Sequence, residues 1–141
     1  MLQVQDLMTH HVLTLRPMEN LRHVEALLRR GSVRHLPVVD EHEQLVGLVT
    51  HRDLLAAAAR GREAPALWAM DAMTRRLTTV RPETPLSEAL QLMLRNKFGC
   101  LPVVTEAGAL VGILSDSDLV RFCGELIAGL DRQAEAAGYE C

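Results

Sequence analysis

Leu45-Val46-Gly47-Leu48-Val49-Thr50 returns 65 residues later as Leu110-Val111-Gly112-Ile113-Leu114-Ser115. Working outward, the same offset aligns residues 35–40 with 100–105 and residues 6–9 with 71–74, without a gap. Two similar units that cannot each bury an apolar face alone are expected to pack together about a pseudo-twofold axis. Such an arrangement creates two related clefts, and paired clefts favour ligand sensing over catalysis.

The composition narrows the class of protein. The chain has 141 residues, of which 48% are hydrophobic and 3% aromatic, and its net charge is -3. This is enough chain for one compact module with a real core. Because basic residues are not in excess and few aromatic side chains are present to stack on bases, nucleic acid is disfavoured as a partner.

The three cysteines form no C-x-x-C pair, so we expect reduced thiols and no zinc cage. The sequence has no readable signal peptide and no apolar run long enough for a membrane span. We therefore expect a cytoplasmic protein that does not enter the membrane.

Hydrophobic periodicity predicts the order strand, helix, strand, strand, helix in both units. The resulting fold class is α+β, with two β-α-β-β-α repeats packed about a pseudo-twofold axis. In the first unit we expect these elements at 12–15, 21–30, 36–39, 45–49 and 53–59, and in the second at 77–80, 86–95, 101–104, 110–114 and from 118 onward. We divide the chain into repeat 1 (1–60), a linker (61–68), repeat 2 (69–124) and a helical tail (125–141), with a short helix within 66–73.

A hydroxyl-x-x-acid pattern follows the last strand of each unit, as Thr50-His51-Arg52-Asp53 and Ser115-Asp116-Ser117-Asp118. Its structural interpretation is a capping box, in which the acid reaches back to the amide of the helix cap. Its functional interpretation adds a ligand. Free amides at a helix start favour a phosphate, and a carboxylate offers two acceptors to the neighbouring hydroxyls of a ribose. The two interpretations can coexist.

With these residues in place, the chain resembles a tandem cystathionine-β-synthase-type repeat pair, the CBS domain pair or Bateman module. The resemblance covers about residues 3–124 and rests on 6–9, 35–40, 45–53 and their copies. It implies a stand-alone bacterial-type regulatory protein whose clefts take AMP, ADP, ATP or S-adenosylmethionine. It also implies a disk-like homodimer.

The resemblance also implies which residues bind. Asp53 with Thr50 would hold the ribose in one cleft, and Asp118 with Ser115 in the other. Residues around the strand that contains the proline would form the adenine slots, and the preceding strand would contribute lower-ranked candidates. These are Val33, Arg34, His35, Leu36 and Pro37, then Phe98, Gly99, Cys100, Leu101 and Pro102, with Thr14 and Thr79 ranked second.

The two copies differ in charge. Arg34, His35, His51 and Arg52 in the first stand where the second has Gly99, Cys100, Asp116 and Ser117. We therefore expect a cation-rich first cleft suited to a nucleotide, with Arg52 as a phosphate ligand. Ser117 adds a hydroxyl to the second cleft, where Asp116 would repel phosphate unless it turns outward or a divalent cation such as Mg2+ neutralises it. The histidines show no metal-binding spacing, so we predict no metal site.

The leading hypothesis is a homodimeric sensor of adenosine ligands that signals to a separate, unknown partner protein and needs no cofactor. The alternative is an interaction module with empty clefts, in which both aspartates only cap helices. An enzyme is disfavoured because the chain lacks a nucleophile elbow, a phosphate loop and a dinucleotide fingerprint.

Overall fold

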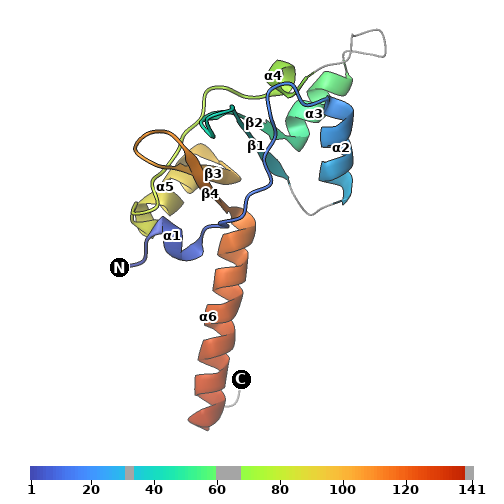
Figure 1. Ribbon diagram of the computed structural model, residues 1–141. Coiled ribbons are helices and arrows are strands. Elements are labelled where there is room, and N and C mark those ends of the chain that lie inside the picture. Colours follow the sequence, from blue (N-terminus) through green and yellow to red (C-terminus); the bar gives the residue numbers. More distant parts are fainter. Residues whose placement is uncertain (31–33, 60–67, 139–141) are drawn as a thin grey trace.

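A computed structural model of the chain describes residues 1–30, 34–59 and 68–138 (Figure 1). Its elements in chain order are α1 (Val4–Leu7), α2 (Leu21–Arg30), β1 (His35–Val39), β2 (Leu45–Thr50), α3 (His51–Ala58), α4 (Ala69–Ala72), α5 (Leu86–Asn96), β3 (Cys100–Val104), β4 (Leu110–Ser115) and α6 (Asp116–Ala136). Val33, the predicted helix stop at 31–32, most of the linker and the last residues of the tail lie outside the described residues.

Each repeat contains one antiparallel hairpin, β1 with β2 and β3 with β4. His35 pairs with Thr50 in the first hairpin, and Cys100 pairs with Ser115 at the equivalent place in the second. The turns also correspond, because Glu43 (φ 62°) and Gly108 (φ 91°) both adopt a left-handed conformation. The mixture of helices and hairpins confirms the predicted α+β class.

The prediction of strands at 12–15 and 77–80 is wrong. Each segment is reduced to one parallel bridge, Leu15 to Val38 and Val80 to Val103. The amide of Leu15 donates to the Pro37 carbonyl at 2.9 Å, but Pro17 two residues later has no amide hydrogen with which to continue the ladder. Local alternation identified the segment correctly as sheet-facing and overestimated its length.

The two cores exchange their first helices. Val4 and Met8, from the start of repeat 1, are buried in the core that contains Leu101 and Leu114 of repeat 2. Ala69 is buried in the core of repeat 1. Backbone hydrogen bonds fix both crossings, from Val4 to the Thr84 carbonyl and from Ala69 to the Glu19 carbonyl. Core membership therefore crosses the boundaries that we drew from the sequence.

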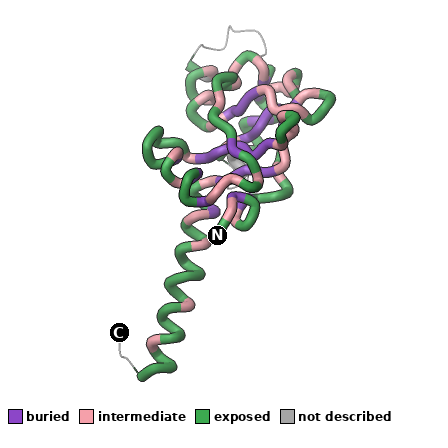
Figure 2. The backbone as a smooth tube through the Cα atoms, turned by 90° about the vertical axis from the view of Figure 1, so that its left-hand side faces the viewer, coloured by how far each residue is buried: buried purple, intermediate pink, exposed green. Residues whose placement is uncertain are grey.

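The exchange brings a methionine of one repeat over a glycine of the other. Met73 lies against Gly47, and Met8 lies against Gly112, in the space that a β-carbon would need. A smaller cluster of Leu48, Cys100 and Ile113 joins the two halves. The buried residues consequently gather in and between the hairpins, as the purple parts of Figure 2 show.

The last helix, α6, runs away from the body of the molecule (Figure 1). Leu126, Ile127 and Leu130 on its outer part are all more than half exposed. Among the described residues, no helix combines the length and apolar character that a bilayer span requires.

Candidate functional site

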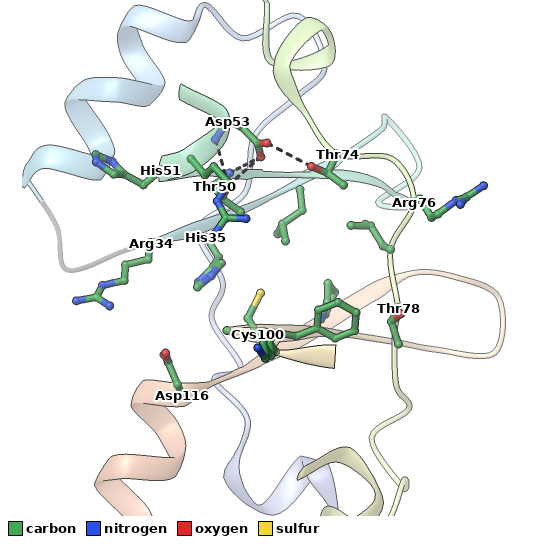
Figure 3. A pocket seen from close by; sticks show the side chains of 17 residues that line it. Arg34, His35, Thr50, His51, Asp53, Thr74, Arg76, Thr78, Cys100 and Asp116 are labelled. Carbon is green, nitrogen blue, oxygen red and sulfur yellow. Dashed lines mark hydrogen bonds between the residues drawn. The ribbon is translucent and has the colours of Figure 1, made fainter. Parts of the chain in front are cut away.

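Two cavities lie where the repeats meet. The larger has a volume of about 510 Å³ and is lined by Arg34, His35, Leu48, Thr50, His51, Arg52, Asp53, Thr74, Arg76, Leu77, Thr78, Lys97, Phe98, Gly99, Cys100, Pro102 and Asp116 (Figure 3). The smaller has about 280 Å³ and is lined by Thr9, His11, Val12, Leu13, Arg34, His35, Ile113, Ser115, Asp116, Ser117, Asp118 and Arg121. Each contains one of the two hydroxyl-x-x-acid turns.

Each cavity draws residues from both repeats, whereas the charge comparison of the two copies attributed the charged residues of each cleft to a single copy. Gly99, Cys100 and Pro102 of repeat 2 line the larger cavity, on which Asp53 of repeat 1 also lies. The physical reason is the exchange of α1 and α4, which pairs the threonine that follows each of these helices with the second strand of the other repeat's hairpin, Thr9 with Ile113 and Thr74 with Leu48.

Asp53 lies at the start of α3 and closes the predicted capping box. Its Oδ2 accepts from the Thr50 amide at 2.8 Å and from the Thr50 hydroxyl at 3.0 Å. Its Oδ1 accepts a longer bond of 3.3 Å from the Thr74 hydroxyl of repeat 2. The helix cap therefore occupies one carboxylate oxygen, and the other has the weakly held partner Thr74, which lines the same cavity (Figure 3).

Asp118 repeats this geometry in a tighter setting. Its Oδ2 accepts from the Ser115 amide at 2.8 Å and from the Ser115 hydroxyl at 3.1 Å. Its Oδ1 accepts from Thr9 at 2.8 Å and from Arg121 at 3.4 Å, and the residue is only 4% exposed. Both turns thus serve as capping boxes, but only Asp53 combines that role with a large open space.

Charge separates the two cavities more clearly than the sequence indicated. Positive side chains outnumber carboxylates four to two in the larger cavity, with histidines counted as neutral: Arg34, Arg52, Arg76 and Lys97 against Asp53 and Asp116. The smaller cavity is balanced, with Arg34 and Arg121 against Asp116 and Asp118. In Figure 3, Arg34 and Arg76 lie at opposite ends of the larger cavity, and both side chains extend outward from it.

Cys100 is buried, and His35 is half-buried on the wall of the same cavity. Burial lowers the pKa of His35, while the nearby Asp116 carboxylate raises it and Arg34 lowers it further. Burial raises the pKa of the Cys100 thiol to about 12, and Asp116 adds to this shift. Both side chains are therefore held in their neutral forms near pH 7.

Most of the predicted site residues lie on the two cavities. Thr50, Arg52, Asp53, Gly99, Cys100 and Pro102 line the larger one, Ser115, Ser117 and Asp118 the smaller, and Arg34 and His35 both. Pro37, Thr14 and Thr79 line neither. Pro37 is buried within β1, and near Thr79 the residues that line the larger cavity are Arg76, Leu77 and Thr78.

Further polar or charged residues on the cavity walls were not predicted from the sequence, among them Thr74, Arg76 and Lys97 on the larger cavity, and Thr9 and Arg121 on the smaller. Thr74 and Thr9 belong to the repeated Met-Thr pair, whose conservation between the two copies was the available signal. Arg76, Lys97 and Arg121 carried no such signal, because they have no charged equivalents at the 65-residue offset. No group of three or more histidine, cysteine or acidic side chains that could hold a metal occurs within the described residues.

This geometry agrees with the comparison to known proteins. The family model for the CBS domain matches residues 4–60 and 69–125. The chain belongs to the CBS domain family. The match spans both repeats and confirms the resemblance drawn from the repeated motifs.

Solved CBS structures share the fold. A protein of Vibrio cholerae assigned to acetoin utilization (AcuB) is 36% identical, with a TM-score of 0.85 over 94% of this chain and 97% of that chain. CBSX2, solved in complex with AMP, is 33% identical, with a TM-score of 0.79 over 88% of this chain and 97% of that one. The CBS domain pair of protein MJ0100, solved with 5′-methylthioadenosine and S-adenosylmethionine, is 27% identical, with a TM-score of 0.78 over the same shares, 88% and 97%.

Curated relatives carry the CBS pair within larger proteins. Homoserine O-acetyltransferase of Methanococcoides burtonii is 34% identical over 121 residues, which are 86% of this chain and 24% of the relative. Inosine-5′-monophosphate dehydrogenase of Methanocaldococcus jannaschii is 28% identical over 84% of this chain and 23% of the relative. The chain thus spans about a quarter of the length of these relatives.

Proposed function

We propose that this CBS pair is a regulatory module that binds adenosine-containing ligands between its repeats. The observation that carries the proposal is the position of Asp53, which lines a cavity of about 510 Å³ and accepts from the hydroxyls of two threonines on the same wall, Thr50 and Thr74. The AMP complex of CBSX2 and the S-adenosylmethionine complex of MJ0100 support this ligand class.

In the larger cavity, the Asp53 carboxylate accepts hydrogen bonds from the two ribose hydroxyls. The Thr74 hydroxyl then gives up its 3.3 Å hydrogen bond to Oδ1 of that carboxylate. Phe98, Gly99, Cys100 and Pro102, which line this cavity, form the adenine slot. The excess of arginine and lysine suits a polyphosphate, so we assign ADP or ATP to this cavity.

The smaller cavity takes a ligand with less charge. Its balanced side chains and its volume of about 280 Å³ fit AMP or an uncharged adenosine derivative better than ATP. Asp116 at its wall disfavours a long phosphate chain unless Mg2+ accompanies the nucleotide. The two sites are therefore unequal in ligand preference.

Regulation follows from differential affinity. A ligand shifts the module between two arrangements only if it binds one of them more tightly, and a separate partner protein reads the result. We propose a homodimer, which would cover apolar side chains such as Leu55, Val120 and Ile127 that are now more than half exposed. We place it in the cytoplasm, where adenine nucleotides and reduced thiols occur together.

Isothermal titration calorimetry with adenosine, AMP, ADP, ATP, 5′-methylthioadenosine and S-adenosylmethionine, with and without Mg2+, tests the proposal. We expect at least one of these ligands to bind, and Asp53→Asn to remove binding to the larger cavity. A ligand at 100 times its dissociation constant should stabilise the fold by about 2.7 kcal/mol, a shift of several degrees in Tm. Asp131→Asn, on the exposed outer part of α6, is the matched control and should bind normally.

A second function, that of an interaction module with empty cavities, is favoured by the hydrogen bonding of Asp118. That carboxylate is buried and already accepts from Thr9, Ser115 and Arg121. The absence of heat and of any thermal shift with all six ligands would support this function and refute the sensor.

A further inference from the structure

Three side chains form a wall that the two cavities share. Arg34, His35 and Asp116 line both the larger and the smaller cavity. Arg34 immediately precedes β1 and His35 is its first residue, both in repeat 1, and Asp116 is the first residue of α6 in repeat 2. A ligand in either cavity therefore faces the same charged groups.

The wall is closely packed at its centre. A β-carbon at Gly99 would lie 3.1 Å from Nε2 of His35 and 3.9 Å from Oδ2 of Asp116, so the glycine allows both side chains to approach. The Asp116 amide donates to the Gly99 carbonyl at 3.0 Å, which fixes the start of α6 against this point. Figure 3 shows His35, Cys100 and Asp116 around the same part of the opening.

We propose that this wall couples the two cavities, so that an anionic ligand in one lowers the affinity of the other for a second anionic ligand. The proposal rests on the proposed function, because it requires that adenosine ligands enter both cavities. It predicts that uncharged adenosine ligands bind to the two cavities independently.

The coupling follows from the number of charges available. One exposed guanidinium, that of Arg34, borders two cavities, and a phosphate that pairs with it in one cavity removes it from the other. The negative charge of Asp116 on the wall of the second cavity is then no longer offset by the positive charge of Arg34, and it repels an incoming phosphate. His35 does not replace the lost charge, because burial lowers its pKa and keeps the ring neutral.

The test compares two ligands in three proteins. Thr78→Trp places a bulky side chain at an exposed position on the larger cavity alone, and Ser117→Trp does the same on the smaller. Calorimetry on each variant gives the association constant of the remaining cavity. The coupling factor is the product of these two constants divided by the overall two-site constant of the wild-type chain.

For AMP we expect a coupling factor of about ten, the usual scale of site-to-site coupling, and for 5′-methylthioadenosine a factor of about one. Arg34→Ala should lower the AMP factor toward one. Lys97→Ala is the matched control, because Lys97 lines only the larger cavity; it should weaken AMP there and leave the factor unchanged.

Equal factors for the charged and the uncharged ligand would overturn the proposal while leaving the sensor intact. The proposal would also be overturned if the wild-type chain bound one AMP and one of the tryptophan variants bound none, because only one cavity would then be a binding site. One AMP per wild-type chain with each variant also binding one would support strong mutual exclusion. Failure of all three proteins to bind either ligand would refute the coupling together with the proposed function.

Discussion

Thr9, near the amino terminus, donates a 2.8 Å hydrogen bond to Asp118, which lies 109 residues further along the chain. The equivalent bond in the other half, from Thr74 to Asp53, is longer at 3.3 Å. Each acid thus caps a helix of its own repeat and also holds a threonine of the other. The two halves use the same design, and they differ in how tightly the acid is enclosed.

This difference predicts unequal losses of stability. Asp118→Ala removes a buried acceptor and leaves the hydroxyls of Thr9 and Ser115 without it, which should cost about 2–3 kcal/mol. Asp53→Ala, at a half-buried position, should cost about 1 kcal/mol, the usual value of a lost cap. Urea unfolding of both variants without ligand measures the two losses. Equal losses would contradict the asymmetry.

The glycines under the exchanged methionines should also differ. A β-carbon at Gly112 would lie 2.9 Å from the Thr9 carbonyl oxygen, whereas the close neighbours at Gly47 are all side-chain atoms of Met73. Because a side chain can move and a paired backbone cannot, Gly112→Ala should destabilise the fold by about 2–3 kcal/mol and Gly47→Ala by about 1 kcal/mol. Thermal unfolding tests the order. Adding Met73→Ala to Gly47→Ala should reduce the strain, and a purely additive loss would count against this account.

Stability should depend on pH through His35. Burial lowers its pKa in the folded state below the ordinary value of 6.5, so the unfolded chain binds more protons as the pH falls below 6.5. The folded state therefore loses stability on acidification through that range and regains it toward pH 7. Chemical unfolding from pH 5 to 7 should show a weaker dependence in His35→Gln than in the wild-type chain.

Thiol reactivity should distinguish two of the cysteines. Cys100 is buried and its pKa is raised to about 12, so it should resist alkylation at pH 8, whereas Cys123 is exposed and should react. In a Cys141→Ser variant, which removes the thiol outside the described residues, we expect one reactive thiol in the folded chain and two after denaturation. Mass spectrometry after iodoacetamide treatment identifies the modified residue. Rapid labelling of Cys100 in the folded chain would contradict the structure.

The sequence predicted the local elements well where one pattern was sufficient. The hydrophobic runs of the two hairpins and the helical spacing of Leu21 and Val24 are local signals, and the structure places β1, β2, β3, β4, α2 and α5 there. The segments before Pro17 and Pro82 gave the same local signal, but a strand also needs a neighbouring strand with which it can pair along its length. Local alternation does not tell whether the folded sheet offers such a neighbour.

By itself, the sequence determined the repeat, the two hairpins with the helices before and after them, and the two capped turns at Asp53 and Asp118, because each depends on neighbours within a few residues. Only the tertiary structure decided that α1 and α4 change places, and therefore that the residues of each cavity come from both repeats. Periodicity tells which face of a segment avoids water, but packing decides against which partner that face is buried. For the same reason, the wall of Arg34, His35 and Asp116 could not be read from the sequence.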